Sequence, residues 1–367
     1  MSVIEAIFGK FDSWLSEALT GRRLPYPSTA SIEPVSNMCQ LECPLCPTGA
    51  KKLNYDRKVM SLETFKVLLD KMPFVRTLDL YKSGEPFLNP DIFAMTRYAA
   101  DQQIEVIIST NFSFSRPDEF FENIVNSGLW KLTISLDGAS QESYSQYRIG
   151  GNFELVMSNI IKLIEAKKRL RSHTPKIVWQ FLVNRFNEHE IPVAQKTADN
   201  LKIPLDILPM DLDDELPDFQ PEGTIQERKA YWLPTDKKYI CDRYQGEHRY
   251  PLFPGICTQL FVRVVVTADG KVFPCCWAWD RKSVVGDLLT ESFEDIWYNQ
   301  KYMSSRSRFL KKDFHSKVQT VCFGCKSFGT TPSLRDKLKL LIAIYREQYG
   351  HRKRRLLRAL TGIFGRG

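Results

Sequence analysis

The sequence lacks any long apolar run. No stretch reaches the roughly 18–20 consecutive apolar residues that a membrane-spanning helix needs. The first residues, MSVIEAIFGKFDSW, are interrupted by Glu5, Lys10 and Asp12, so we do not expect a signal peptide. Internal repeats and low-complexity tracts are absent, and the 43% hydrophobic and 26% charged residues are ordinary for a globular protein. These features exclude a disordered or fibrous chain.

The body of the chain also lacks an excess of charge of one sign. The net charge is +8, but ten Lys/Arg and two Asp/Glu lie from Thr331 onward, so the preceding 330 residues carry 41 charges of each sign. A neutral body offers no basic stripe for nucleic acid, and we therefore predict no nucleic-acid partner. Only the basic C-terminal tail calls for an acidic partner.

Cysteine, by contrast, occurs nine times. Without a secretory signal, so many cysteines indicate a reducing compartment and metal or redox chemistry rather than disulfides. The sequence therefore predicts a cytoplasmic protein.

Between residues 30 and 210 the sequence alternates between strand-like and helix-like segments. We predict strands at Ser31–Val35, Thr77–Tyr81, Glu105–Ser109, Lys131–Leu136, Ile177–Val183 and Leu205–Leu208. Ser61 and Asn152 are placed to cap the helices that begin after them. Strands that alternate with helices indicate α/β structure with a parallel sheet and right-handed crossovers. These units suit a partial (β/α)6 TIM-like barrel, whose chemistry sits at the C-terminal ends of the strands.

We predict four parts of the chain. They are an N-terminal amphipathic helix in residues 1–29, the barrel in residues 30–235, a small cysteine-rich α+β domain in residues 236–330 and a basic amphipathic helix in residues 331–367. The acidic, proline-containing segment DLDDELPDFQPEGT stops the strand–helix alternation and indicates a linker or lid. The N-terminal helix can pack on the body of the protein or lie on a membrane surface.

The first cysteine cluster is Cys39, Cys43 and Cys46, spaced C-x3-C-x2-C directly after the first predicted strand. Three thiolates on one short loop can hold three irons of a 4Fe–4S cube. The fourth iron would have no protein ligand from this loop and would be open to a substrate or cofactor, as in catalytic metal sites. A zinc site that lacks its fourth ligand is the alternative for the same residues.

This loop resembles the signature of radical S-adenosylmethionine (SAM) enzymes, and the resemblance extends over roughly residues 30–330. The segment Ser83, Gly84, Glu85 and Pro86 follows the second predicted strand and resembles the family motif that holds the SAM amino group. The chemistry fits, because an ammonium needs a carboxylate and backbone carbonyls, and Gly84 lets the backbone come close. An ordinary turn is the alternative.

Other positions match the same family. Ser109 and Asn111 end the third predicted strand, and Ser135 ends the fourth. In the family, polar residues at these places contact SAM or face the substrate, and helix capping is the alternative. Arg148 resembles a family arginine that pairs with the SAM carboxylate, a task that suits a guanidinium, although a surface salt bridge would also explain it.

The resemblance implies a definite chemistry. A reduced cluster gives one electron to SAM, the C–S bond breaks, and the resulting 5′-deoxyadenosyl radical takes a hydrogen atom from the substrate. The protein supplies binding, orientation and exclusion of water. The resemblance also implies a protein reductant such as flavodoxin or ferredoxin.

A second set of cysteines follows the linker. Cys257, Cys275, Cys322 and Cys325 combine a G-x4-C hairpin with a distant C-x2-C pair. Four thiolates can hold a 4Fe–4S cluster or a zinc ion. The spacing resembles the auxiliary-cluster domain of the SPASM/twitch group of radical SAM enzymes, and is similar to the twitch domain of 2-deoxy-scyllo-inosamine dehydrogenase. That resemblance favours one auxiliary 4Fe–4S cluster.

Two further cysteines lie in the same region. Cys276 directly follows Cys275, and neighbouring side chains of a strand point to opposite faces, so we expect Cys276 to be a buried residue rather than a ligand. Cys241 can be a structural residue, a spare thiol, a proton donor or an alternative ligand, and the sequence leaves these open.

Three functions are compatible with these motifs. The first is an oxidoreductase acting on a small polar or carbohydrate-like substrate, with the auxiliary cluster as electron acceptor. The second is a peptide maturase that makes a crosslink or epimerises a residue. The third, a binding protein with two structural metal sites, is disfavoured because the motifs of the SAM pocket are intact. The candidate bases near predicted strand ends are Asp137, Asp211, Asp213, Asp214 and Glu215, and the sequence does not choose among them.

The C-terminal tail is basic and amphipathic. Five basic residues lie between Arg352 and Arg358 and are interleaved with leucines. Such a helix favours contact with a membrane surface or an acidic partner. A solvated basic face on a docked helix is the alternative. With the membrane interpretation, the protein is peripheral on the inner face of the membrane and its substrate can be lipid-linked.

Overall fold

The structure, a computed structural model, describes residues 24–212, 222–241, 244, 257–308, 318–325, 339–340 and 342. The helix expected in the first twenty residues and the basic tail beyond Gly350 lie outside these residues. Within the described part of the chain, no helix is both long enough and apolar enough to cross a membrane.

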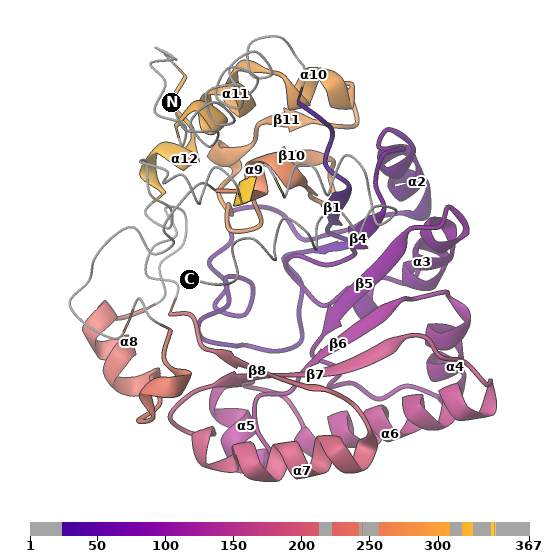
Figure 1. Ribbon diagram of the computed structural model, residues 1–367, viewed down its shortest axis with the longest axis vertical. Helices are drawn as coiled ribbons and strands as arrows, with labels where there is room; N and C mark the ends of the chain where they lie inside the picture. The colour runs from indigo at the N-terminus through magenta and orange to yellow at the C-terminus, as the bar shows by residue number, and fades with distance from the viewer. Residues whose placement is uncertain are drawn as a thin grey trace, which may run out of the picture.

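One large sheet organises the molecule (Figure 1). Six of its strands are parallel neighbours: β1 (Thr29–Ile32), β4 (Thr77–Asp79), β5 (Glu105–Thr110), β6 (Lys131–Ser135), β7 (Lys176–Val183) and β8 (Leu205–Pro209). Their order in space is their order in the chain. This arrangement confirms the predicted α/β fold with a partial (β/α)6 barrel.

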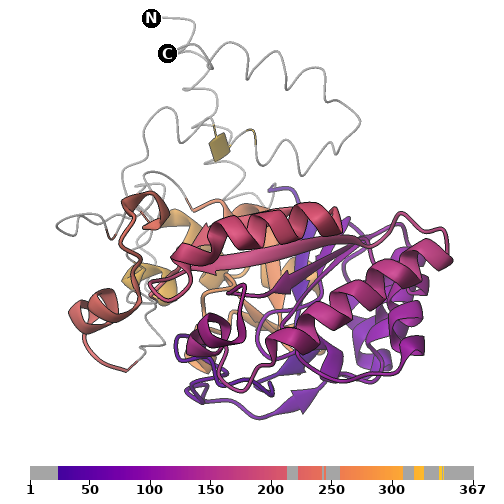
Figure 2. The same ribbon diagram turned by 90° about the horizontal axis from the view of Figure 1, so that it is seen from below.

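Helices cover the outer face of the curved sheet (Figures 1 and 2). They are α2 (Leu62–Asp70), α3 (Ile92–Asp101), α4 (Asp118–Asn126), α5 (Gln141–Tyr147), α6 (Phe153–Arg169) and α7 (Ile191–Leu201). The predicted caps are present, because the Ser61 side chain accepts a hydrogen bond from Thr64 N and the Asn152 side chain accepts one from Leu155 N. One continuous apolar core, which includes Val106, Ile108 and Ile160, lies between sheet and helices.

The first predicted strand is interrupted. Strand β1 ends at Ile32, and a short strand β2 (Val35–Ser36) follows, paired antiparallel with β3 (Lys58–Val59). Pro34 has no N–H to donate to a ladder, so it separates the two strands. The break turns the chain out of the sheet, and the three-cysteine loop lies between β2 and β3.

The C-terminal cysteine-rich part continues the barrel sheet rather than forming a separate one. Strand β9 (Arg263–Val266) pairs parallel with β1, in register Thr29↔Arg263, and β10 (Lys271–Phe273) and β11 (Gly286–Asp287) extend the sheet by antiparallel pairing. An uncovered β1 would present unpaired backbone groups at a sheet edge, and β9 satisfies them. The boundary at residues 235 and 236 stays a prediction.

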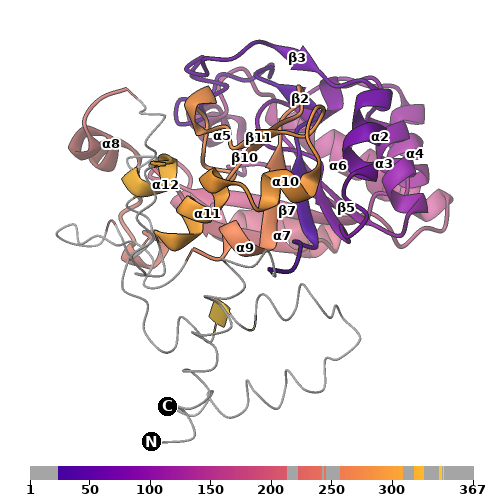
Figure 3. The same ribbon diagram turned by 90° about the horizontal axis from the view of Figure 1, so that it is seen from above.

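Short helices complete the described residues (Figure 3). They are α8 (Ile225–Trp232), α9 (Gln259–Val262), α10 (Phe293–Trp297), α11 (Gln300–Ser307) and α12 (Val321–Gly324), with 3-10 turns η1 (Pro86–Leu88), η2 (Glu188–Glu190), η3 (Lys237–Tyr239) and η5 (Arg281–Ser283). Helix α8 follows the predicted linker, most of which, residues 213–221, lies outside the described part, and α9 to α12 lie on the side of the molecule that carries β10 and β11 (Figure 1).

Candidate active site

The three-cysteine loop is folded tightly beside the C-terminal ends of the barrel strands. Cys46 N donates to Cys43 O at 3.1 Å and Ala50 N donates to Cys46 O at 2.8 Å, so the loop turns like the start of a helix. Cys43 is buried, Cys39 and Cys46 are half-buried, and all are free thiols. An apolar cluster that includes Leu41, Leu45, Tyr147 and Trp232 packs around them and excludes water.

This environment suits thiolates that bind a metal cluster. Burial raises the pKa of Cys39 to about 12 and that of Cys43 to about 11, so an isolated thiolate would be costly in either place. Iron bound to the sulfurs removes this cost, because a coordinating thiol is deprotonated outright. The chemistry of the donor set therefore fits the predicted iron–sulfur cluster.

Arg148 stands at the edge of this loop. Its Nε donates to Asp137 Oδ2 at 2.6 Å, and its Nη1 lies 3.8 Å from Cys43 Sγ. Asp137 is fully buried and also accepts a hydrogen bond from Leu182 N at 2.7 Å. Arg148 thus neutralises a buried carboxylate and faces a predicted cluster ligand. The pairing of Arg148 with the SAM carboxylate stays a prediction. Asp137, one of the candidate bases, is engaged in the ion pair with Arg148.

The segment Ser83–Pro86 lies directly against the three-cysteine loop. Glu85 N donates to Met38 O at 2.8 Å, and Gly84 adopts a φ of +74°. A Cβ at Gly84 would lie 2.6 Å from both Val35 O and Met38 O, so only glycine permits this close approach. Pro86 starts η1 immediately after Glu85. The structure therefore brings this segment and the cysteine loop together.

The Glu85 carboxylate joins two strand ends. It accepts hydrogen bonds from Thr110 Oγ1 at 2.7 Å, from Asn111 N at 2.9 Å and from Phe87 N at 3.1 Å. Burial nevertheless raises its pKa to about 7. A cation that binds next to this carboxyl would lower its pKa again and favour the ionised form. The ammonium group that is expected there would act in this way.

This pKa gives a testable pH dependence. The folded state holds the Glu85 proton more tightly than the unfolded state, so ionisation between about pH 5 and pH 8 costs on the order of 3 kcal/mol of stability. The free energy of unfolding, measured with urea on protein free of SAM, is therefore expected to fall over this range as the pH rises. In Glu85→Gln this decrease in the free energy of unfolding should be smaller by about 3 kcal/mol.

The matched control is Glu227→Gln, because Glu227 is an exposed carboxylate of the α8 capping box whose pKa is lowered by hydrogen bonds from Thr224. This variant should leave the fall between the two pH values in place. An equal fall in the wild type and in Glu85→Gln would contradict the assignment.

Asn111 links the third strand end to the cysteine loop. Its Nδ2 lies 3.5 Å from Cys39 Sγ, and its Oδ1 accepts a hydrogen bond from Gln40 Nε2 at 2.8 Å. Ser109 is half-buried on β5 and Ser135 is buried at the end of β6. All three lie at the C-terminal ends of neighbouring strands, as predicted, and their contacts to SAM stay predictions.

Ser83 belongs to a buried hydrogen-bonded group that the sequence reasoning missed. Its hydroxyl and its N–H both donate to the Glu33 carboxylate, the N–H at 3.2 Å, and Ser36 Oγ donates to the same carboxylate. Tyr55 Oη lies 3.5 Å from Ser83 Oγ. The signal was available, because Glu33 is a charged residue within a predicted buried strand.

The four cysteines of the second set also come together. Burial raises the pKa of Cys257 to about 12, and Cys322 and Cys325 raise it further by charge repulsion. Burial likewise raises the pKa of Cys275, with Cys322 and Cys257 among the charges that act on it. Cys257 and Cys275 thus both lie close enough to Cys322 for its charge to act on them, and the assignment of all four cysteines to one cluster stays a prediction.

Arg306 on α11 holds this centre in place. Its Nε donates to Leu260 O at 3.0 Å and its Nη1 donates to Trp297 O at 2.6 Å, while its guanidinium lies 4.0 Å from the Trp297 ring centroid. Burial lowers its pKa to about 10. Arg306 thereby ties the helix after Cys257 to α10 and α11.

Cys276 is half-buried, like Cys275, rather than fully buried as the sequence predicts. Burial raises its pKa, and the positive charges of Arg263 and Lys82 oppose that rise. Burial raises the pKa of Cys275, and the charges of Cys276, Cys322 and Cys257 raise it further, that of Cys276 most. The two cysteines lie in a turn after β10 rather than in a strand, and both pack on one small apolar cluster, so strand alternation does not separate them and the choice of Cys275 as the ligand stays a prediction.

Cys241 does not join the second set. It packs on the apolar cluster around the three-cysteine loop, together with Cys39 and Cys46. Asp211, another candidate base, accepts a hydrogen bond from Tyr244 Oη at 2.9 Å. Asp213, Asp214 and Glu215 lie outside the described residues.

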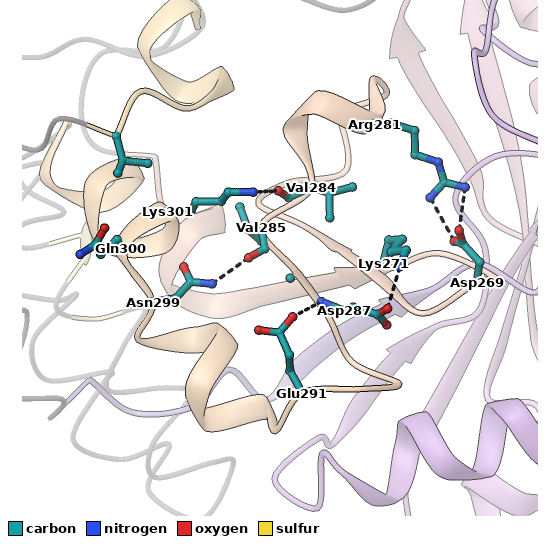
Figure 4. Close-up of a pocket in the computed structure, with 12 residues that line it drawn as sticks. Asp269, Lys271, Arg281, Val284, Val285, Asp287, Glu291, Asn299, Gln300 and Lys301 are labelled. Atoms are coloured by element: carbon teal, nitrogen blue, oxygen red, sulfur yellow. Dashed lines mark hydrogen bonds and ion pairs between the residues drawn. The ribbon is translucent and has the colours of Figure 1, made fainter.

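Two surface cavities flank these sites. One, of about 980 Å³, lies between the three-cysteine loop and α8 and is lined by Leu45, Gly49 and Tyr231 among others. The other, of about 920 Å³, lies beside β10 and β11 (Figure 4). There Lys271 pairs with Asp287 and Arg281 pairs with Asp269, so charges in the wall match one another. None of the predicted cofactor-binding residues lines either cavity.

Comparison with known families decides the identity. Residues 34–178 match the radical SAM superfamily, and residues 257–326 match the SPASM domain, an iron–sulfur cluster-binding domain. The protein is a radical SAM enzyme with a SPASM domain. The two matched regions contain, respectively, the three-cysteine loop and the second set of four cysteines.

Three known proteins illustrate the similarity of this radical SAM enzyme to others. The AdoMet-dependent heme synthase of Methanosarcina barkeri is 24% identical over 321 residues, covering 79% of this chain and 88% of the relative. The probable GTP 3′,8-cyclase of Methanococcus maripaludis is 25% identical over 295 residues, covering 76% and 94%. SuiB of Streptococcus suis bound to SAM has a TM-score of 0.61 at 14% identity, covering 86% and 76%, and shows the shared fold.

The cofactors of this radical SAM enzyme are SAM and two 4Fe–4S clusters. The residues present fit both clusters, because two separate groups of free thiols, each buried or half-buried, are available. Among the described residues, no set of three or more His, Cys, Asp or Glu side chains is arranged to hold a single metal ion. The assignment of individual cysteines to the clusters stays a prediction.

The neighbouring cysteines Cys275 and Cys276 give a direct test of that assignment. Cys275→Ala is expected to lose about four of about eight irons per chain, because one ligand of the auxiliary cluster is removed. Cys276→Ala, the adjacent control, should keep all of them, because the G-x4-C spacing identifies Cys275 as the ligand. Iron and sulfide analysis after anaerobic reconstitution measures both. The reverse pattern would show that Cys276 is the ligand.

Proposed function

We propose that this radical SAM enzyme is an oxidoreductase that removes a hydrogen atom from a small, polar, carbohydrate-like substrate and passes an electron to the auxiliary cluster. The observation that carries the proposal is the segment from Asp79 to Glu85. It begins beside Arg263 and Cys276 and ends at the Glu85 carboxylate beside the three-cysteine loop. One short segment therefore spans the space between the two sets of cysteines.

Apart from Leu80, which packs in the apolar core, and Gly84, the side chains along this segment are polar. Asp79 forms an ion pair with Arg263 on β9, where the register places β1 between the two strands. Burial raises the pKa of Tyr81, and Cys276 is among the charges that act on it. Lys82 follows, close enough to Cys275 and Cys276 for their charges to act on its pKa. A wall of phenol, thiol, ammonium and ion pair favours a substrate rich in hydrogen-bonding groups.

The substrate class cannot be taken from the relatives, because their names differ. One relative is a heme synthase and another is a probable GTP cyclase. These names imply substrates of unrelated shape, so the polar wall of this chain is the better guide. A lipid-linked form of the substrate depends on the basic tail, which lies outside the described residues.

When bound, the reduced first cluster and SAM supply the abstraction of a hydrogen atom, and the auxiliary cluster supplies a one-electron acceptor. The chain itself orients these groups. Glu85 links the ends of β4 and β5, and Arg148 neutralises the buried Asp137 next to Cys43. The apolar cluster with Tyr147 and Trp232 shields the cysteine loop from water. An alcohol carbon that loses a hydrogen atom must then lose one electron and one proton to become a carbonyl.

The proposal is tested with reconstituted enzyme, SAM and a flavodoxin reductant under anaerobic conditions. Candidate polyols and amino sugars are screened for those that stimulate formation of 5′-deoxyadenosine. A stimulating substrate should yield a product lighter by two hydrogens, and deuterium on the oxidised carbon should appear in 5′-deoxyadenosine.

Two outcomes would overturn the proposal. If the product keeps the mass of the substrate, the reaction is redox-neutral. If only a peptide stimulates SAM cleavage, then the alternative function, a peptide maturase that crosslinks or epimerises, is correct.

A further inference from the structure

Lys82 is a buried cation without a hydrogen-bond partner in the described part of the chain. It follows β4, three residues before Glu85. Its Nζ lies 3.7 Å from the ring centroid of Trp279 and 5.2 Å from that of Phe273. Aromatic faces attract an ammonium but do not accept its hydrogen bonds as an oxygen or sulfur does. A buried ammonium that lacks such an acceptor costs free energy, so an acceptor is missing from this place.

The nearby charges show where that acceptor lies. Burial lowers the pKa of Lys82, while Glu33, Cys276 and Cys275 raise it and Arg281 lowers it. The Glu33 carboxylate already accepts hydrogen bonds from Ser36 and Ser83. The other negative groups lie on one loop, the segment from Phe273 to Trp279 that packs over the ammonium.

The other cations of this region are neutralised by carboxylates. Arg263 pairs with Asp79, and Arg281 pairs with Asp269. No ion pair to Lys82 is present within the described residues. Glu33 is the carboxylate whose charge acts most on Lys82, but the ammonium forms no hydrogen bond with it, so the charge of Lys82 can also act on whatever Cys275 binds.

We propose that Lys82 sets the reduction potential of the auxiliary cluster by placing a buried positive charge beside it. A cluster held by four thiolates carries net negative charge, and this charge grows by one unit on reduction. A buried cation stabilises the more negative state, because interactions between charges are strong away from water. Net charge and hydrogen bonds to the sulfurs are known levers on cluster potentials. A higher potential makes the cluster a better electron acceptor, so the inference deepens the proposed function and rests on it.

The test measures the potential directly, without substrate or SAM. Cys39, Cys43 and Cys46 are changed to alanine so that the auxiliary cluster is the remaining redox centre. In this background, Lys82→Met, Lys82→Arg and Lys82→Gln are compared by redox titration monitored by electron paramagnetic resonance. Lys82→Met is expected to lower the reduced-to-oxidised ratio at the original midpoint at least tenfold, a shift of about 59 mV for one electron.

Controls separate charge from structure. Lys82→Arg keeps the charge and should keep the potential near that of the parent. Lys282→Met removes an exposed lysine from the same domain and should leave the potential unchanged. Should Lys82→Met fail to assemble a cluster, Lys82→Gln supplies the neutral comparison, because it keeps a polar side chain of similar length.

Unchanged potentials in the neutral variants would overturn the inference, as would an equal shift in Lys82→Arg. Because no substrate takes part, these results are independent of the proposed function. A lowered potential together with redox-neutral chemistry would refute the oxidoreductase alone, and substrate oxidation with an unchanged potential would refute the role of Lys82 alone.

Discussion

Replacing Cys39, Cys43 and Cys46 together by alanine is expected to abolish SAM cleavage while about four of about eight irons stay on the chain. The three thiols share one loop, so the variant removes the ligands of one cluster. The second set of cysteines lies around a different centre and keeps its own cluster. Metal analysis and chromatography of 5′-deoxyadenosine measure the two effects on the same sample.

Cys241→Ala is the matched control for this variant. Cys241 is a half-buried thiol that packs on the same apolar cluster as the three-cysteine loop. Both iron content and SAM cleavage should survive its replacement. A triple variant that still carries about eight irons would contradict the ligand assignment. About four irons with one zinc in the wild type would make the C-terminal site structural and would remove the electron acceptor.

Gly84→Ala is expected to lower the free energy of unfolding by more than about 3 kcal/mol and to abolish SAM binding. The φ of +74° alone costs an L-residue about 1–2 kcal/mol. The added Cβ would also lie 2.6 Å from two backbone carbonyl oxygens, which have no room to move because they belong to β2 and the start of the cysteine loop. Urea unfolding and calorimetric titration with SAM measure the two losses.

Gly223→Ala separates strain from collision. Gly223 has a φ of +78°, but the nearest atom to its added Cβ is a flexible side-chain oxygen of Glu227 at 3.1 Å. This control should therefore lose only the conformational cost of about 1–2 kcal/mol. Similar losses in the two variants would show that the contact between Gly84 and the cysteine loop carries no weight.

Much of the fold could be predicted because its signals are local. The six parallel strands are apolar segments that alternate with helices. Ser61 and Asn152 each accept a hydrogen bond from the N–H three residues later and so cap the helix that follows. The pairing of β1 with β9 has no local signal, since the two strands come from opposite parts of the chain. The sequence therefore predicted the second domain but not that its strands continue the sheet of the barrel.

The short motifs of the candidate site could be predicted from the sequence, but the contacts between them could not. The cysteine spacings and the segment around Glu85 can be recognised in the sequence, because each is a short motif with a defined chemistry. The ion pair between Arg148 and Asp137 and the place of Lys82 depend on which strand ends meet, and no spacing reveals that. A charged residue within a predicted strand, such as Glu33, or directly after one, such as Lys82, is the sequence feature that indicates such buried polar groups.

The pairing of β1 with β9 also constrains how the chain folds during synthesis. The first strand of the barrel leaves the ribosome long before Arg263, its register partner in the final sheet. Until then its edge is exposed and able to pair with other chains. Contacts of such high sequence separation form slowly and leave aggregation-prone intermediates. A fragment that ends before residue 263 would keep that edge uncovered, so the iron–sulfur cluster-binding domain also supplies the strand that closes this edge of the barrel sheet.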